Sequence, residues 1–201
     1  MKVDWANSIH SIQHLLNTRT SNRTANMIPV IAITGPVGAG KSTLAAKLSP
    51  CVLSTDHYLP DYDLVPEHER DLPERADFSR LARDLASLRN GNQTLIPRWS
   101  FQSHKREGEQ PIAPANLIVL EGIHALHEPP HAPLANLIDL RVFVEATSSV
   151  RWSRWEQIES SGERGWGVEK ARAFFHAVAE PTFARYESNY RSRADIIVVN
   201  H

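Results

Sequence analysis

The chain has 201 residues, of which 41% are hydrophobic and 22% charged. This length suits one compact domain that buries its core without metals, and the single cysteine excludes an intramolecular disulfide. The formal net charge of −1 leaves no electrostatic footprint for nucleic acid or an anionic membrane. No apolar stretch approaches the roughly 20 residues that span a bilayer, and no signal-type apolar core is present, so we expect a cytoplasmic protein.

Residues 1–26 are expected to form an N-terminal helix and a linker. Apolar side chains recur there at helical spacing, at Trp5, Ile9, Ile12, Leu15 and Leu16. A polar stretch at residues 17–26 follows and is expected to be the linker. The helix can pack on the body or on a second copy of the chain, so a homo-oligomer stays open. Residues 27–201 are expected to form the main domain.

Short apolar runs alternate with helical patterns through the main domain. The expected strands are residues 27–33, 51–54, 117–120, 137–144 and 194–199. The expected helices are residues 41–48, 78–88, 147–160 and 168–190. The stretches 59–74 and 97–114 are expected to be irregular connections. Strands that alternate with helices predict a doubly wound α/β fold with a parallel sheet.

The sequence GPVGAGKS, from Gly35 to Ser42, matches the phosphate-binding pattern G-x-x-x-x-G-K-[ST]. It follows an expected strand and opens an expected helix, which is the context in which the backbone wraps around phosphates. Lys41 is expected to reach the β- and γ-phosphates and to act in catalysis, and the Ser42 hydroxyl is expected to bind Mg²⁺. The residues expected to hold ATP are Gly35, Val37, Gly38, Ala39, Gly40, Lys41, Ser42 and Thr43.

Two acidic residues, Asp56 and Glu121, follow expected strands at positions where ligands bind in an open α/β sheet. A carboxylate near the γ-phosphate can orient an acceptor hydroxyl and accept its proton, and a second can hold the Mg²⁺ shell. We assign Asp56 the role of base and Glu121 the role of holding the Mg²⁺ shell. Arg151 and Arg154 lie three residues apart on one expected helix, so both can point at a shared anion.

Five segments, in this order, resemble the uridine kinase family, whose broader group includes phosphoribulokinases and bacterial pantothenate kinases. They are the phosphate loop, STDHY at 54–58, IPRWSFQSHKR at 96–106, VLEGI at 119–123 and ADII at 194–197. The resemblance covers about residues 28–199. It implies a P-loop NTPase three-layer sandwich with a helical lid at about residues 151–167. It also implies a kinase that uses ATP and Mg²⁺ to phosphorylate a hydroxyl on a small molecule.

The resemblance also implies roles for single residues. Asp56 accepts the proton of the sugar 5′-hydroxyl, Asp71 holds the ribose hydroxyls, and His104 and Trp99 lie beside the nucleobase. Arg154, a catalytic residue, neutralises the transferred group together with Arg151 or Arg164 from the lid. The residues that it places at the acceptor are Asp56, Tyr58, Asp71, Trp99, His104, Arg151 and Arg164.

The chain departs from the family pattern at the lid and at the base site. Trp155, Gln157 and Ile158 stand where family lids carry arginines, and Phe174 stands where a family glutamine contacts the base. These departures affect the prediction of uridine as the acceptor more than the prediction of the reaction type. A nucleoside such as uridine or cytidine is the expected acceptor. A sugar or pantothenate-like alcohol is the alternative, and a nucleotide-dependent switch with little catalysis is the third reading.

Overall fold

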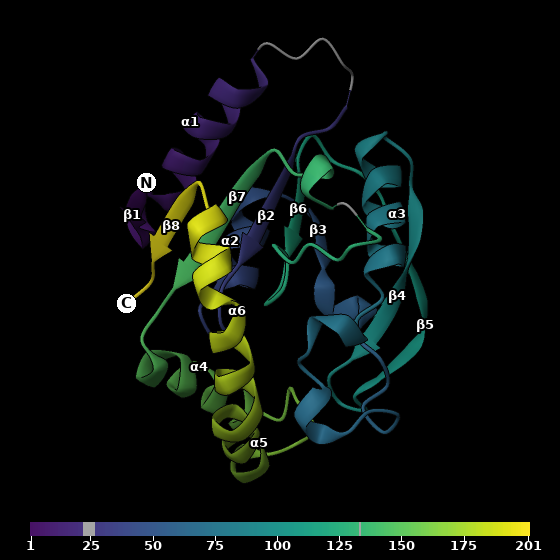
Figure 1. Cartoon of the computed structure of the whole chain (residues 1–201), viewed down its shortest axis with the longest axis vertical. Coiled ribbons are helices and arrows are strands. Elements are labelled where there is room, and N and C mark those ends of the chain that lie inside the picture. The colour runs from purple at the N-terminus through teal and green to yellow at the C-terminus, as the bar shows by residue number, and fades with distance from the viewer. Residues whose placement is uncertain (22–26, 133) are drawn as a thin grey trace.

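The computed structural model describes residues 1–21, 27–132 and 134–201. A six-stranded parallel sheet runs through the molecule in the order β1-β8-β7-β2-β6-β3 (Figure 1). Its strands are β1 (Lys2–Asp4), β2 (Val30–Thr34), β3 (Cys51–Ser54), β6 (Ile118–Glu121), β7 (Leu140–Glu145) and β8 (Ile196–Val199). Because β2 lies between β7 and β6, the phosphate loop that follows it leaves from the interior of the sheet rather than from an edge.

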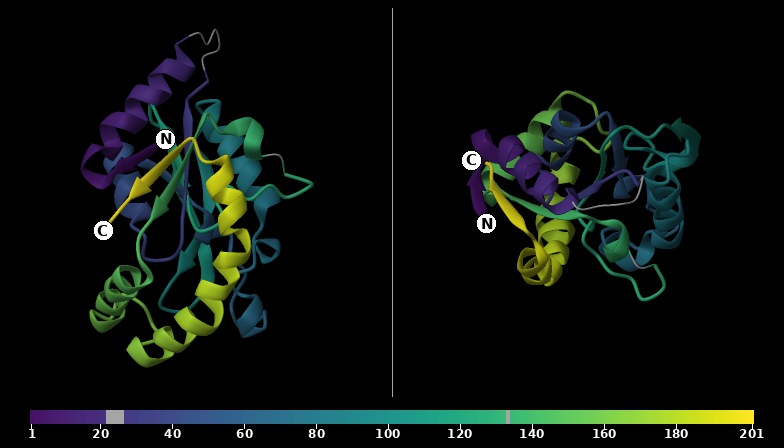
Figure 2. Two further views of the ribbon diagram at one scale, coloured as in Figure 1. Left: turned by 60° about the vertical axis from the view of Figure 1, so that its left-hand side comes forward. Right: turned by 90° about the horizontal axis from the view of Figure 1, so that it is seen from above.

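Helices cover both faces of this sheet, so the expected three-layer α/β sandwich is confirmed (Figure 2). Helices α1 (Ser8–Thr20) and α2 (Lys41–Leu48) pack on one face, and α3 (Phe78–Arg89) and α6 (Glu180–Arg193) pack on the other. Successive residues of β2 point to opposite faces, and all five are buried. This burial explains the continuous apolar run of the strand, since a central parallel strand has no solvent-facing side.

A second, antiparallel sheet pairs β4 (Thr94–Ser100) with β5 (Lys105–Ile112). The expectation of an irregular connection over residues 97–114 is therefore wrong for most of that stretch. Strand β5 has no buried residue, and β4 buries few, so the hairpin lacks the alternation of apolar and polar residues that announces a strand. Backbone pairing joins the two strands, and the buried side chains of Ile96 and Trp99 anchor β4 on the core.

The expected helix over residues 168–190 forms as two helices. They are α5 (Val168–Phe174) and α6, and a π-helical turn, Phe175–Ala179, joins them. Helix α4 (Ser148–Ser160) begins one residue after its expected start because the Thr147 side chain caps it, accepting from the Val150 N–H. The other expected strands and helices of the main domain are present with small shifts at their ends.

The N-terminal segment packs directly on the main domain. Strand β1 pairs with β8, and three residues are too few to show a pattern in the sequence. Helix α1 extends into the expected linker, and residues 22–26 lie outside the described residues. Ile12 and Leu16 are buried in the core cluster that also contains Leu44 of α2, so the body of this chain covers the apolar face of α1. The division of the chain at residue 27 stays a prediction.

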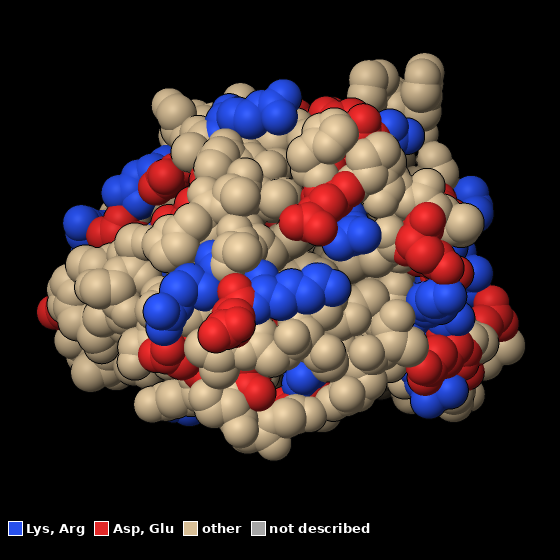
Figure 3. Space-filling view, turned by 90° about the horizontal axis from the view of Figure 1, so that it is seen from below, with Lys and Arg blue, Asp and Glu red and all other residues tan. Residues whose placement is uncertain are grey.

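The surface at the α4–α5 end of the molecule carries basic and acidic side chains side by side (Figure 3). Neither sign forms a continuous patch on this face. In the part of the chain that the structure describes, no helix combines the length and the apolar character needed to cross a membrane.

Candidate active site

The phosphate loop between β2 and α2 depends on glycine. Gly35, Gly38 and Gly40 have φ values of 145°, 74° and 100°, which L side chains rarely adopt. A Cβ at Gly35 would lie 2.1 Å from the Val144 carbonyl oxygen, and one at Gly38 would lie 2.5 Å from that of Arg151. Helix α2 begins directly after the loop, so its first backbone N–H groups have no helical partners and are available to an anion.

Lys41 is buried across the mouth of this loop, and its Nζ donates to the Pro36 carbonyl oxygen at 3.0 Å. Burial lowers the pKa of Lys41, whereas the charges of Glu121 and Asp56 act in the opposite direction. The two carboxylates therefore favour the ammonium form. A buried cation beside open backbone N–H groups is suited to a phosphate that enters the loop.

Ser42 and Glu121 meet beside the loop. The Ser42 hydroxyl donates to Glu121 Oε2 at 3.2 Å, and burial followed by the charge of Asp56 raises the pKa of Glu121. A hydroxyl and a carboxylate fit Mg²⁺, which takes oxygen ligands and completes its shell with water and substrate phosphates. No group of three or more His, Cys, Asp or Glu side chains among the described residues could hold a metal alone. A metal here would share this pair with bound phosphate.

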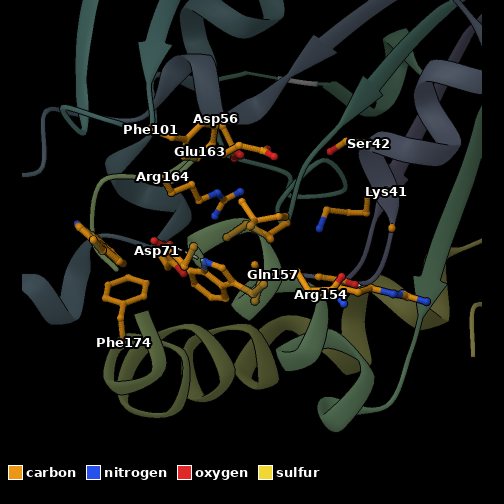
Figure 4. Close-up of a pocket in the computed structure, with 18 of the residues that line it drawn as sticks. Lys41, Ser42, Asp56, Asp71, Phe101, Arg154, Gln157, Glu163, Arg164 and Phe174 are labelled. Atoms are coloured by element: carbon orange, nitrogen blue, oxygen red, sulfur yellow. Dashed lines mark hydrogen bonds between the residues drawn. The ribbon is translucent and has the colours of Figure 1, made fainter. Parts of the chain in front are cut away.

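These side chains open into a cavity of about 520 Å³ between the phosphate loop, the predicted lid (residues 151–167) and the β4–β5 hairpin (Figure 4). Lys41 and Phe174 lie on opposite sides of it, so the cavity has a polar end and an aromatic end. The residues expected from sequence that line it are Val37, Gly38, Gly40, Lys41, Ser42, Thr43, Asp56, Asp71, His104, Glu121, Arg154 and Arg164.

Three expected acceptor residues, Tyr58, Trp99 and Arg151, do not line this cavity. Tyr58 is fully buried in the core, and its hydroxyl donates to Asp84 Oδ2 at 2.8 Å. Trp99 is buried behind Tyr62, with 5.1 Å between the ring centroids. The resemblance placed Tyr58 and Trp99 by position in the sequence, but in the structure both serve packing. We no longer propose them as acceptor contacts.

Arg151 and Arg154 of α4 do not converge on one space, contrary to the expectation, because only Arg154 lines the cavity. Arg151 is buried in an ion pair with Glu180 of α6 and does not line the cavity. Arg154 donates to the Gly38 carbonyl oxygen and to Asn200 Oδ1, both at 3.2 Å. These contacts tie Arg154 to the phosphate loop and to the end of β8, so the geometry does not favour a catalytic role for it.

Arg164 is the lid arginine that faces the reacting groups. Its guanidinium lies 4.4 Å above the Phe101 ring, and Figure 4 shows the side chain extending toward the space between Asp56 and Lys41. It makes no hydrogen bond or ion pair within residues 1–21, 27–132 and 134–201. The turn that follows α4 brings this cation over the cavity, a reversal that helical spacing could not predict.

Of the aromatic end of the cavity, only His104 was predicted from the sequence. Tyr62, Phe101 and Trp166 line it together with Phe174, which was noted only as a departure from the family. The lid is held over this end because the Gly165 N–H donates to the Phe101 carbonyl oxygen at 3.2 Å. Tyr62, Phe101 and Trp166 lie in irregular segments without a repeating spacing. The tryptophans that cluster around the lid were the one available signal.

Asp71 lies in the cavity, and its carboxyl group has an unusual pKa. Burial and the nearby charge of Asp56 raise that pKa from 3.8 to about 7, although Arg164 and a hydrogen bond from Tyr62 oppose the shift. The folded protein therefore keeps a proton on Asp71 that the unfolded chain releases above pH 4. Stability is lost as pH rises from about 4 to about 7 and then stays level, because the folded state binds the extra proton in that window.

We expect Asp71→Asn to raise the melting temperature at pH 8 by several degrees and to raise it less at pH 5. The amide is neutral at every pH, so the variant avoids the cost of ionising a half-buried carboxyl group. Because Asp71 is only half-buried, solvent reduces this cost to about 1–2 kcal/mol at pH 8, which corresponds to about 2–8 °C for a protein of this size. Thermal unfolding at both pH values measures the difference. An equal offset at the two pH values would contradict the raised pKa.

The parallel sheet, the glycine loop and the buried lysine that follows it define the P-loop class of phosphate-transferring proteins. A family model described as "Phosphoribulokinase / Uridine kinase family" matches residues 65–200. The chain belongs to this family. It is therefore a phosphotransferase, and the family implies the use of ATP.

Relatives and solved structures agree with this assignment. A uridine kinase of Clostridium botulinum is 29% identical over 182 residues, which cover 84% of this chain and 86% of that protein. A possible uridine kinase of Bacillus stearothermophilus has a TM-score of 0.60 at 18% identity, with 94% and 97% of the two chains covered. A D-glycerate 3-kinase of Cryptococcus neoformans has a TM-score of 0.58 at 14% identity, with 86% and 84% covered. At these identities the two structures support the fold alone.

Proposed function

We propose that this chain transfers the γ-phosphoryl group of ATP, bound with Mg²⁺, to a hydroxyl group of a small molecule. The observation that carries the proposal is the convergence of Lys41, the Ser42–Glu121 pair and Asp56 in one cavity. The loop backbone binds the phosphates and Lys41 neutralises the transferred group. Ser42 and Glu121 would hold the metal, which would supply positive charge to stabilise the phosphates.

Asp56 orients the acceptor and takes its proton. The hydroxyl oxygen forms a bond to the γ-phosphorus, its proton passes to the Asp56 carboxylate, and the bond from the γ-phosphorus to the ADP oxygen breaks. Arg164 lies above the negative charge that develops on the transferred group. The predicted lid excludes water, which would otherwise compete with the acceptor.

The identity of the acceptor is open to two readings. The relatives named uridine kinase favour a nucleoside, with its 5′-hydroxyl beside Asp56. The polar end of the cavity is also compatible with another hydroxyl-bearing metabolite, because carboxylates accept hydrogen bonds from any hydroxyl group. A screen of nucleosides, sugars, sugar alcohols and hydroxy acids for ADP formation with Mg²⁺-ATP tests the function itself. Acceptor-stimulated ADP release supports a kinase, and its absence throughout would favour a nucleotide-dependent switch.

Replacing Asp56 with asparagine is expected to lower kcat at least about a hundredfold. General bases contribute about 10²–10⁴ in rate, and the loose transition state of phosphoryl transfer places the effect toward the lower part of that range. ATP affinity should stay close to that of the unchanged protein, because Asp56 faces the acceptor rather than the loop. Coupled ADP-release kinetics and ATP titration measure the two quantities. Unchanged turnover would refute the role of base.

A further inference from the structure

The aromatic end of the cavity is already filled by side chains of the protein. His104 and Trp166 stack face to face, with 4.5 Å between their ring centroids and 8° between their planes. Phe174 packs on Trp166 at 4.6 Å, and Tyr62 contacts both rings of the stack, at 5.5 Å from His104 and 6.0 Å from Trp166. The protein therefore places an indole ring where a planar ligand would lie on His104.

Backbone hydrogen bonds fix the positions of both rings of this stack. His104 has a φ of 55°, and its N–H donates to the Ser100 carbonyl oxygen at 2.8 Å in the hairpin turn. The lid residue next to Trp166, Gly165, donates to the Phe101 carbonyl oxygen of the same turn. A side chain at Gly165 would collide with that turn, since its Cβ would lie 2.3 Å from the Gln102 carbonyl oxygen. The close approach that brings the two rings together therefore requires this glycine.

A nucleobase binds to protein aromatic residues by stacking on a free ring face. The face of His104 that Trp166 covers is not free, and the guanidinium of Arg164 covers the Phe101 ring at 4.4 Å. A base would have to displace Trp166 and break its contacts with His104 and Phe174. The aromatic end thus disfavours binding of a nucleoside, whereas a ligand without a planar ring binds without displacing Trp166.

The polar end of the cavity favours hydroxyl groups without a negative charge. Asp56 and Glu121 line it, and Asp71 lines the same cavity beside Tyr62, so an anionic acceptor would add its charge to three carboxyl groups. Hydroxyl groups instead donate hydrogen bonds to these oxygens. The cations at this end, Lys41, Arg154 and Arg164, lie beside the phosphate that the loop would hold.

We infer that the acceptor is a compact, uncharged polyol of monosaccharide size, whose hydroxyls bind Asp56 and Asp71 while Trp166 occupies the space that a base would need. The inference rests on the proposed function, because it names the acceptor of the same transfer. One polyol hydroxyl gives its proton to Asp56 and forms the bond to the γ-phosphorus. ADP leaves with the electron pair of the broken P–O bond.

The experiment compares full-length protein on three acceptor sets in a coupled ADP-release assay with Mg²⁺-ATP. The sets are monosaccharides and sugar alcohols, the nucleosides uridine, cytidine and adenosine, and hydroxy acids such as glycerate. The unchanged protein should give a kcat/KM for its best polyol at least about tenfold above that for every nucleoside and hydroxy acid, a difference that pocket shape alone can produce.

Trp166→Ala tests the ring directly, and it should raise kcat/KM for nucleosides about tenfold, because a base can then stack on His104. Trp152→Ala is the matched control. Trp152 lies in the same lid but packs on Phe175 at 5.5 Å and does not line the cavity, so the ratio of polyol to nucleoside activity should not change.

The outcomes separate the inference from the proposed function. A nucleoside or a hydroxy acid as the best acceptor overturns the inference and leaves the kinase in place. A folded Trp166→Ala variant that gains nothing on nucleosides overturns it as well. If no acceptor of any set increases ADP formation, although ATP raises the melting temperature, the proposed function itself fails. If Trp166→Ala does not fold, the ranking of acceptors by the unchanged protein decides.

Discussion

Replacing Lys41 with alanine is expected to reduce kcat by about 10³-fold or more, to the background of the assay. The ammonium group lies over the phosphate loop, where charge develops on the transferred group in a site that excludes water. Removing one preorganised neutral donor from such a site costs about 10²–10³ in rate, and a full positive charge contributes at least as much. The variant should also bind ATP more weakly, so that ATP raises its melting temperature less than that of the unchanged protein.

Lys47→Ala is the matched control for this experiment. Lys47 lies on the same helix, α2, but is exposed and lies 5.7 Å above the Trp5 ring rather than in the cavity. It should keep the turnover and the ATP-induced thermal shift of the unchanged protein. If Lys41→Ala turned over at the rate of the control, this result would contradict the proposed role of the phosphate loop in the mechanism.

Replacing Arg164 with glutamine is expected to lower kcat about 10³-fold with a smaller effect on the KM for ATP. An arginine that neutralises the transferred phosphoryl group is worth about 10³–10⁵ in rate, and Arg164 is the lid arginine that extends between Asp56 and Lys41. The change should cost little stability, because the guanidinium has only ring contacts to lose. Steady-state kinetics over a range of ATP concentrations separates the two parameters.

Arg172→Gln provides the comparison for Arg164→Gln. Arg172 lies on α5, is exposed, and forms an ion pair with Glu156 of α4. An exposed pair of this kind contributes little to stability, so this variant should behave as the unchanged protein. Equal kinetics of the two variants would contradict the assignment of Arg164, and a larger loss for Arg154→Gln would return the role to the residue first chosen from the sequence.

Much of the fold could be predicted from the sequence, because burial leaves a pattern there. β2, β6 and β7 are mostly apolar since helices cover both faces of the sheet, and the phosphate loop has a recognisable spacing. The pattern failed where the residues of a strand are not buried. Strands β1 and β5 have no buried residue and are held by backbone pairing, which leaves no periodic signal.

The residues of the site also differ in how far the sequence predicts them. Asp56 and Glu121 could be predicted because they follow strands of one parallel sheet, and such ends meet at one edge. The direction of a lid side chain depends on how the turn after α4 folds back, so position in the sequence favoured Arg154 over Arg164. Tyr58 could not be separated from a site residue either, because its hydrogen bond to Asp84 joins segments that only the folded chain brings together.

Strand β1 affects whether the edge of the sheet can pair with other copies of the protein. Without it, β8 would be the outermost strand of the sheet, an Ile-Ile-Val-Val segment with its backbone donors and acceptors open on one side. Such a strand is a template on which a neighbouring molecule can add its own, and it is a recognised route to aggregation. By occupying that position with three residues, of which two are charged and exposed, the chain closes the apolar edge of its sheet with a short polar border.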